Sequence, residues 1–232
     1  MNIGGFQKLS LLDFPGEVAC IVFTSGCDFR CPFCHNASLV TSDDMPHTDE
    51  SDIFAYLEKR SGVLDGVVIT GGEPLIHSDI KDFIIKIRSL GLKIKLDTNG
   101  SFPKKLKELL SENLLDYVAM DIKHTRTGYS LAADVNAELI LPKIEESIFL
   151  LKNADIPAEF RTTLVKGIHT ESDAGKIAKE LSTSLPYYLQ SYTNSGDVIS
   201  PNGLTAFTED ELSRMLRDAK EFCPNAALRG VT

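Results

Sequence analysis

The sequence predicts an α/β protein built around a parallel sheet, and three observations support this fold class. Short apolar segments rich in β-branched residues alternate with segments of helical periodicity along the 232 residues. Six strand–helix pairs follow one another in this way, and consecutive βα units imply parallel strands joined by right-handed crossovers. Each apolar segment ends in polar residues, and parallel α/β folds build their sites from such residues at the carboxyl edge of the sheet.

The six predicted strands are short and mostly apolar, as expected of strands that are covered on both faces. They begin near Val18, Val67, Lys93, Tyr117, Ala158 and Tyr187. Their polar ends lie at residues 24–26, 70–73, 97–99, 121–123, 161–163 and 190–192. The sheet should therefore present these polar residues along one edge.

The six predicted helices carry apolar residues at spacings of three and four, so each presents one apolar stripe to the sheet. They cover residues 51–60, 78–90, 103–114, 142–152, 171–181 and 209–222. Ser78, Thr170 and Thr208 are suitable N-caps, and Pro142 suits a first helical turn. Gly91 is positioned to end the second helix as a C-cap glycine does.

Six βα units are fewer than the eight of a complete barrel. An incomplete, splayed barrel and an open doubly wound sheet both satisfy the pattern, and periodicity alone does not choose between them. The length of 232 residues is ordinary for a single α/β barrel, so we expect residues 1–232 to form one domain.

Composition and charge exclude several classes of function. Lys and Arg number 24 and Asp and Glu number 33, so the net charge is −9 and the chain is a poor candidate for binding nucleic acid. No apolar segment approaches the roughly 18 residues of a membrane span. Residues 1–5 lack the basic-then-apolar order of a signal peptide. We therefore expect a cytoplasmic protein without nucleic-acid or membrane partners.

Three of the five cysteines crowd into eight residues directly after the first predicted strand. Cys27, Cys31 and Cys34 have the spacing C-x3-C-x2-C. In a cytosolic protein such clustering favours a metal or redox site over disulfides. Three thiolates on a tight loop can hold three irons of a [4Fe–4S] cubane, whereas ferredoxins use four cysteines. The fourth iron then stays open to a substrate, by the same logic that leaves a catalytic zinc with an open position.

Two other interpretations of the cysteine loop stay open. A zinc site would need His35 or Cys20 as its fourth ligand, but His35 is adjacent to Cys34 and Cys20 lies inside an apolar strand. A redox pair of Cys31 and Cys34 would leave Cys27 without a role.

The chain resembles the radical S-adenosylmethionine (SAM) superfamily over nearly its whole length, because its cysteine motif has Phe33 before the last cysteine and follows the first strand of a βα repeat. The resemblance implies a partial (β/α)6 barrel with a cluster loop at about residues 26–36. It also implies a [4Fe–4S] cluster on the three cysteines, whose open iron is chelated by the amino and carboxylate groups of SAM. One electron from the cluster would cleave a carbon–sulfur bond, giving methionine and a 5′-deoxyadenosyl radical.

A Gly-Gly-Glu-Pro motif ends the second predicted strand and is similar to the superfamily motif that meets the methionyl ammonium of SAM. Glycines also let a backbone approach a ligand closely. Gly71, Gly72 and Glu73 are therefore expected at the SAM site. The resemblance also places Asp97 and Thr98 against the methionyl group. The alternative interpretation is a strand-ending turn with the Asn-Gly that follows.

Asp121 and Lys123 are two residues apart, so they point to the same side of their strand. They resemble the D-x-K motif of glycyl-radical activases. That motif implies that Lys123 meets the carboxylate of SAM and that Asp121 lies near the ribose or a nearby cation. The alternative is a solvated pair at a strand end. By the same resemblance, Arg161, Thr163 and Tyr192 would border the adenosine.

Residues 11–16 and the Cys-His-Asn sequence at 34–36 look like the activating enzymes of glycyl radical enzymes, in particular the family that activates anaerobic ribonucleoside-triphosphate reductase. Ala37 departs from that family, in which proline is common at this position. The resemblance implies an oxidoreductase that abstracts a hydrogen atom from a glycine of such a partner. It also implies an electron donor such as flavodoxin or ferredoxin. Residues 124–140 are then either a receiver for the glycine loop or a surface excursion.

Two other functions are compatible with these motifs. A radical synthase of the 7-carboxy-7-deazaguanine synthase type would act on a small molecule. A zinc-binding scaffold would have no chemistry of its own.

Overall fold

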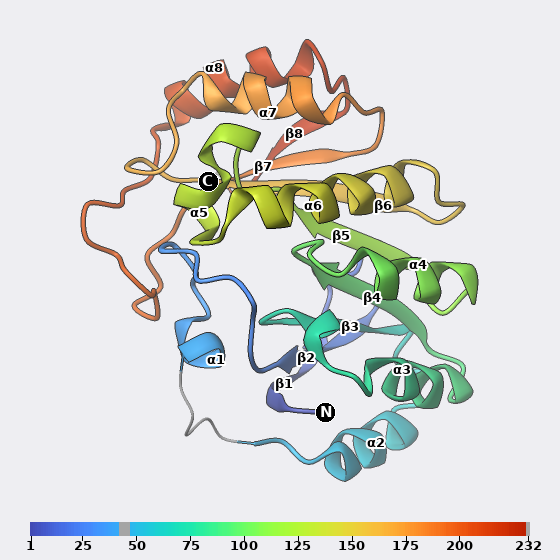
Figure 1. Ribbon diagram of the computed structural model, residues 1–232. Helices are drawn as coiled ribbons and strands as arrows, with labels where there is room; N and C mark the ends of the chain where they lie inside the picture. Colours follow the sequence, from blue (N-terminus) through green and yellow to red (C-terminus); the bar gives the residue numbers. More distant parts are fainter. Residues whose placement is uncertain (42–46, 231–232) are drawn as a thin grey trace.

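The strands of the sheet follow one another in space in the same order as in the chain (Figure 1). The structure, a computed structural model, describes residues 1–41 and 47–230. Within these residues the strands are β1 (Ile3–Ser10), β2 (Ala19–Thr24), β3 (Gly66–Gly71), β4 (Lys93–Thr98), β5 (Tyr117–Asp121), β6 (Ala158–Leu164), β7 (Tyr187–Ser191) and β8 (Ala226–Arg229). β1 is antiparallel to β2, and all other neighbours are parallel. The predicted α/β fold class is confirmed, and the strand order, which never reverses, favours the splayed barrel over the doubly wound sheet.

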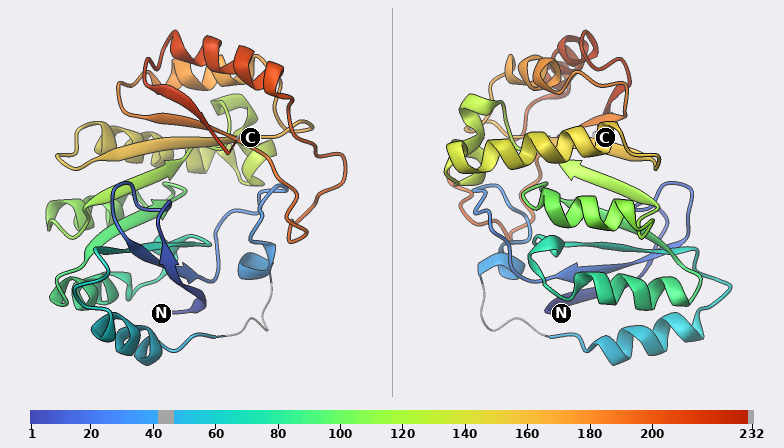
Figure 2. Two further views of the ribbon diagram at one scale, coloured as in Figure 1. Left: turned by 180° about the vertical axis from the view of Figure 1, so that it is seen from behind. Right: turned by 45° about the vertical axis from the view of Figure 1, so that its right-hand side comes forward.

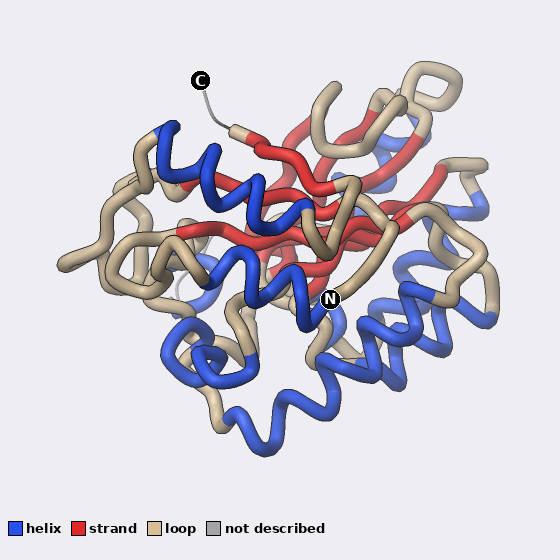
Figure 3. The backbone as a smooth tube through the Cα atoms, turned by 90° about the horizontal axis from the view of Figure 1, so that it is seen from above, coloured by secondary structure: helices blue, strands red, loops and turns tan. Residues whose placement is uncertain are grey.

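The longer helices cover the outer face of the curved sheet (Figures 1 and 3). They are α2 (Glu50–Lys59), α3 (Ile80–Ser89), α4 (Pro103–Ser111), α6 (Ala137–Lys152), α7 (Asp173–Leu181) and α8 (Glu209–Lys220). Short elements lie in the connections, namely α1 (Ala37–Thr41), η1 (Pro74–Ile76), η2 (Arg126–Gly128) and α5 (Tyr129–Ala133). In the part of the chain that the structure describes, no helix is long and apolar enough to cross a membrane.

Two strands, β1 and β8, lie outside the six predicted βα units. β1 contains Gly4 and Gly5, and most of its residues are partly or fully exposed, so it lacks the apolar run of a strand covered on both faces. β8 has only four residues and pairs with residues 187–190 of β7, so that Gln190 lies beside Arg229. Both are edge strands, and tertiary pairing rather than local pattern defines them.

The ends of two helices agree with the sequence pattern. The hydroxyl of Thr208 accepts a hydrogen bond from the Glu211 N–H at 3.3 Å, and the Glu211 carboxylate accepts one from the Thr208 N–H at 2.7 Å. This reciprocal capping box starts α8. Gly91 follows the C-cap residue of α3 with a φ of 79°, as a glycine that ends a helix does.

Three predicted helix starts are wrong. α3 and α7 have Asp79 and Ser172 at the N-cap, in place of the predicted Ser78 and Thr170. α6 begins at residue 137 rather than at Pro142, because the side chain of Asn136 accepts a hydrogen bond from the Glu138 N–H at 3.0 Å and starts the helix earlier. Pro142 therefore lies inside the helix.

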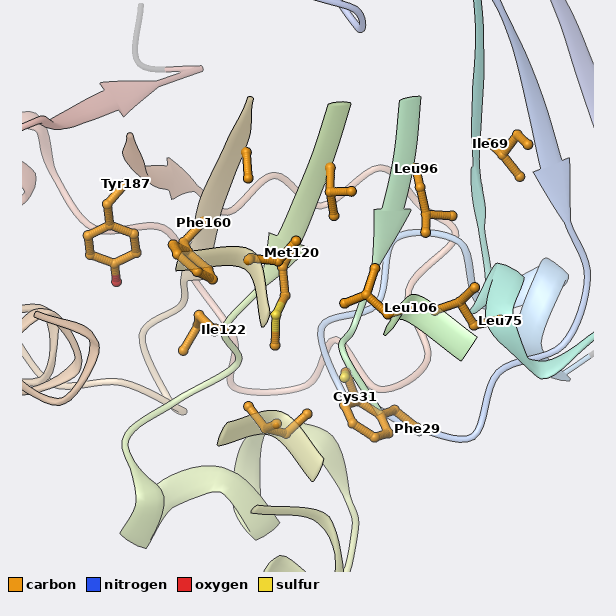
Figure 4. Packing of buried hydrophobic residues seen from close by; sticks show 14 of the residues in the cluster. Phe29, Cys31, Ile69, Leu75, Leu96, Leu106, Met120, Ile122, Phe160 and Tyr187 are labelled. Carbon is orange, nitrogen blue, oxygen red and sulfur yellow. The ribbon is translucent and has the colours of Figure 1, made fainter. Parts of the chain in front are cut away.

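Alternate residues of each strand face opposite sides of the sheet, and this alternation separates the core from the site. The outer-facing side chains of the strands pack against side chains from the connections and helices. The strand residues include Ile69, Leu96, Met120, Phe160 and Tyr187, and the residues that pack on them include Leu75 of η1 and Leu106 of α4 (Figure 4). The intervening residues face the inside of the curve, where the register of β5 and β6 sets Asp121 beside Arg161. A smaller apolar cluster on the inner side consists of Phe14, Ala19, Ile21 and Val68.

Candidate functional site

A cavity of about 440 Å³ lies at the carboxyl edge of the sheet. The cysteine loop forms one wall, and inward-facing residues of β1 to β7 with the polar residues at the strand ends contribute the others. The predicted site residues that line it are Cys27, Cys31, Cys34, Phe33, Gly71, Gly72, Asp97, Thr98, Asp121, Lys123, Arg161 and Thr163. The fold thus brings together all of the predicted site residues except Glu73 and Tyr192.

The cysteine loop follows β2 and is held in place by backbone hydrogen bonds. The Gly26 N–H donates to the carbonyl of Leu39 in α1 at 2.7 Å, and the Arg30 N–H donates to the carbonyl of Ala133 at the end of α5 at 3.0 Å. Figure 4 shows Cys31 beyond the ends of the strands that carry Leu96 and Met120. Segments from both sides of the loop therefore fix its path.

The long connection between β7 and α8 also reaches the cysteine loop. The N–H groups of Ile199 and Ser200 donate to the carbonyls of Cys34 and Pro32, at 3.4 and 2.9 Å respectively. Figure 2 shows this connection running from the upper strands down beside α1. The far end of the sheet thus contributes to the wall around the thiols.

Of the three cysteines in the loop, Cys31 is buried and Cys27 and Cys34 are partly exposed. Cys31 is 7% exposed, and the sulfur of Cys27 accepts a hydrogen bond from the Phe29 N–H at 3.4 Å. Burial raises the pKa of the Cys27 thiol to about 12 and that of Cys31 to about 11. Thiolates at these positions would need a nearby positive charge, which a metal centre supplies.

The donor set fits a cluster held by three cysteines. Cys20 and Cys223 are fully buried elsewhere, and the Cys223 thiol donates to the carbonyl of Ala178 at 3.5 Å. Among the described residues, no three His, Cys, Asp or Glu side chains converge as ligands of a single metal ion would. Zinc requires four ligands around one ion, whereas each corner of a cubane takes its own thiolate. The three loop cysteines can thus supply one thiolate to each of three corners of a cubane, whereas a structural zinc site would need a fourth protein ligand.

The end of β3 touches the cysteine loop at Gly72. The Gly72 N–H donates to the carbonyl of Thr24 at 2.8 Å, and the Glu73 N–H donates to the carbonyl of Gly26 at 2.9 Å. A Cβ on Gly72 would overlap the carbonyl oxygen of Gly26 and lie 2.7 Å from its carbonyl carbon. Glycine at this position lets the two loops meet.

Glu73, the third residue of the Gly-Gly-Glu-Pro motif, lies behind the lining of the cavity, and its place at the SAM site stays a prediction. Its carboxylate is fully buried and accepts hydrogen bonds from the Leu75 N–H at 3.0 Å, the Thr98 hydroxyl at 2.8 Å and the Asn99 N–H at 2.6 Å. Burial raises the pKa of Glu73 to about 7 even though these three donors favour the charged form. The side chain joins the end of β3 to the end of β4, and so it supports the cavity wall from behind.

A row of alternating charges crosses the cavity wall from β4 to the end of β5. The Arg161 guanidinium donates to Asp97 at 3.2 Å and to Asp121 at 2.9 Å, and the Lys123 ammonium donates to the other oxygen of Asp121 at 2.9 Å. Lys95 also contacts Asp97. Although burial opposes it, the charges of Arg161 and Lys123 hold the pKa of Asp121 well below its usual range. Asp121 and Lys123 therefore form a partly exposed charge network with Arg161 rather than an isolated pair at the strand end.

Tyr192 is also absent from the cavity wall. It is 5% exposed, and its hydroxyl is one of the buried polar groups without a hydrogen-bond partner among the described residues. Gln190 lines the cavity instead, because the register of β6 and β7 sets it beside Thr163. Side chains alternate along β7, in which Tyr187 and Leu189 are buried, and this alternation could have predicted that Gln190 faces the other side, where the cavity lies. Other lining residues that were not predicted are His35, Asn36 and Asn99.

Residues 124–140 pack beneath the cysteine loop. This segment contains η2, α5 and the first turn of α6, and Tyr129, Ala132 and Ala133 are buried in it. The ring of Tyr129 meets that of Phe29 edge to face, with centroids 6.4 Å apart. The segment thus buries one face against the cysteine loop, whereas Leu131 and Leu139 are exposed on it.

Comparison with known proteins agrees with this arrangement. The family model of the radical SAM superfamily matches residues 21–181. A protein of Methanocaldococcus jannaschii, provisionally named a glycyl-radical enzyme activating enzyme, is 30% identical over 99% of this chain and 96% of its own length. The GTP 3′,8-cyclase of Aquifex aeolicus is 25% identical over 93% of this chain and 69% of its own length. The crystal structure of a radical SAM methyltransferase from Sphaerobacter thermophilus superposes with a TM-score of 0.72 at 14% identity, covering 96% of this chain and 68% of the other.

Proposed function

This chain belongs to the radical SAM superfamily, and from that premise we propose that it cleaves SAM reductively to install a glycyl radical on a partner enzyme. The observation that carries the proposal is the position of Cys27, Cys31 and Cys34 opposite the charged strand ends, across one cavity. Thiols alone would suit many metals. Thiols that share a cavity with Lys123 and Asp121 suit a cluster that binds a zwitterionic amino acid.

The residues divide into those that would hold the cluster and those that would hold SAM. Cys27, Cys31 and Cys34 would bind a [4Fe–4S] cluster, which supplies one electron to the carbon–sulfur bond of SAM. The ammonium of Lys123 is the group suited to the SAM carboxylate, and Asp121 keeps that ammonium charged and oriented at 2.9 Å.

A polypeptide glycine fits the charges of this cavity better than a nucleotide does. Among the described residues of the wall, the cations Lys123 and Arg161 both already contact carboxylates, those of Asp121 and Asp97. A triphosphate would need further cations, whereas a glycine backbone is uncharged. The relative from Methanocaldococcus jannaschii, which is aligned over nearly its whole length, supports the same choice.

A second candidate is a radical synthase that acts on a small molecule. The similarity to the GTP 3′,8-cyclase of Aquifex aeolicus, which extends over 93% of this chain, favours it. This candidate uses the same cluster and the same SAM site, so only the substrate distinguishes the two. The cytoplasmic location stays a prediction under either function.

The proposed function predicts a glycyl radical on the partner. Reduced protein should be mixed anaerobically with SAM, a flavodoxin or ferredoxin as electron donor, and anaerobic ribonucleoside-triphosphate reductase or another glycyl radical enzyme. We expect a doublet in the EPR spectrum that disappears when SAM is omitted. Rapid turnover of a small molecule, with no radical on any glycyl enzyme tried, would favour the synthase instead.

Lys123→Ala is expected to weaken SAM binding by about 1.5–3 kcal/mol, the typical contribution of a charged hydrogen bond. The dissociation constant, measured by equilibrium dialysis of the reconstituted protein, should rise about 10- to 150-fold. The iron content should not change, since Lys123 is not a proposed ligand. Lys220→Ala, at an exposed lysine in the last turn of α8, is the matched control and should leave binding unchanged. Unaltered affinity in Lys123→Ala would remove Lys123 from the SAM site.

A further inference from the structure

Two buried histidines behind the cavity wall, His124 and His169, stack on each other. Their ring centroids are 4.5 Å apart and their planes differ by 11°. His124 is 7% exposed and His169 is 5% exposed. His124 follows β5 and His169 precedes α7, so the pair joins the carboxyl ends of two neighbouring strands. We call this pair the histidine clasp.

The hydrogen bonds of His169 define which of its nitrogens carries the proton. The Val165 N–H donates to Nδ1 of His169 at 3.2 Å, so this nitrogen is unprotonated. The proton is therefore on Nε2, which lies 2.9 Å from the carbonyl of Lys123 and donates to it. His169 thus holds the backbone of Lys123 from a neighbouring loop.

His124 makes the reciprocal connection. The Thr125 N–H donates to its Nδ1 at 2.8 Å, which leaves Nε2 to donate to the carbonyl of Ile168 at 3.3 Å. Asp173 lies 3.8 Å from the same Nε2. Each histidine therefore comes from one loop and holds a carbonyl of the other.

The clasp is needed because Lys123 lies past the end of the sheet. The last ladder residue of β5 is Asp121, and the Ile122 N–H still donates to the carbonyl of Arg161 at 2.7 Å. Beyond that point no strand neighbour within the described residues holds the Lys123 carbonyl. A lysine side chain has several freely rotating bonds, so an unanchored backbone would spread the ammonium over many positions.

Tight packing holds the clasp together. The ring of His169 meets the ring of Phe33 in the cysteine loop, with centroids 6.2 Å apart. A Cβ on Gly128 would overlap the imidazole of His124. Burial and the neighbouring His124 lower the pKa of His169 to about 4, so the neutral ring that these hydrogen bonds require is the form present near pH 7.

We propose that His169 is a positioning residue for SAM binding, which acts by holding the backbone of Lys123 so that its ammonium faces the cavity. His124 completes the clasp by fixing the loop from which His169 projects. The proposal rests on the proposed function, because it assumes that Lys123 meets the carboxylate of SAM.

The test is a double-mutant cycle in SAM affinity on the reconstituted full chain. His169→Phe keeps the stacked ring and removes both hydrogen bonds, whereas His169→Gln keeps a donor near the position of Nε2. We expect the dissociation constant to rise about five- to tenfold in His169→Phe because, of the two lost hydrogen bonds, the one to the Lys123 carbonyl affects SAM binding. It should rise less than about twofold in His169→Gln. In a Lys123→Ala background, His169→Phe should have almost no further effect, because the group that it positions is gone.

The same cycle separates positioning from a merely structural role. If His169→Phe weakened SAM binding equally in the wild-type and Lys123→Ala backgrounds, the proposal would be overturned. Unchanged SAM affinity of His169→Phe in the wild-type background would also overturn it. Gly128→Ala, which displaces His124, replaces His169→Phe if that variant does not fold, and the same expectations apply to it. Wild-type protein that fails to bind SAM would refute the proposed function itself. Wild-type binding without coupling between His169 and Lys123 would refute only the positioning role.

Discussion

Replacing Cys27, Cys31 or Cys34 by alanine is expected to abolish reductive cleavage of SAM and to leave the protein without a complete cluster. The three thiols line one cavity, and no other cysteine is near enough to substitute, since Cys20 and Cys223 are fully buried elsewhere. Anaerobically reconstituted wild-type protein should bind about four irons per chain. Each variant should lose this iron and release no methionine or 5′-deoxyadenosine from SAM.

Cys20→Ala and Cys223→Ala are the matched controls, and both should keep the iron and the cleavage activity. Both side chains are fully buried, so these variants lose some stability through their cavities but no ligand. Stoichiometric zinc with no uptake of iron would contradict the prediction. So would full iron content in any of the three loop variants.

Gly72→Ala is expected to have the second largest effect. The added methyl group would overlap the carbonyl of Gly26, a backbone atom that no side-chain rotation can move. The loops must separate, which breaks the 2.9 Å hydrogen bond from the Glu73 N–H to Gly26 and shifts Cys27. Overpacking of this kind costs about 3 kcal/mol of unfolding free energy. SAM binding should weaken at least about tenfold, because both walls of the cavity move.

Gly5→Ala in β1 is the matched control for Gly72→Ala. Its Cβ would meet Phe23 at 3.5 Å, an ordinary contact, and its backbone is not in the left-handed region. Thermal unfolding of the apoprotein and equilibrium dialysis with SAM measure the two effects separately. A Gly72→Ala protein with normal stability and normal SAM affinity would show that the contact between the two loops is dispensable.

The sequence was sufficient to predict the six βα units and half of the residues that line the cavity. Parallel strands bring their carboxyl ends to one edge, so polar residues that follow each apolar run must meet there. This physical rule alone predicts that Asp97, Asp121 and Arg161 share an edge, and the register of β5 and β6 confirms the pairing of the last two. The cysteine spacing predicted its own loop because the motif is local.

Local pattern was insufficient where a residue's role depends on a distant partner. The Gly-Gly-Glu-Pro motif did not indicate that the Glu73 carboxylate accepts hydrogen bonds from three donors, in its own loop and at the end of β4. Pro142 was expected to start a helix that Asn136 starts earlier. For Pro142, a hydrogen bond made elsewhere outweighed the propensity of the residue itself.

The sequence by itself determined the class of the fold, the cysteine loop and the edge of the sheet where the site lies, because these follow from periodicity and spacing. Only the tertiary structure decided the edge strands β1 and β8, the choice of Gln190 over Tyr192, and the clasp of His124 and His169 behind Lys123. The two histidines are 45 residues apart (169 − 124) and follow no motif. Their contact arises because β5 and β6 are neighbours, and the neighbours of a strand are a property of the folded sheet rather than of any segment of the chain.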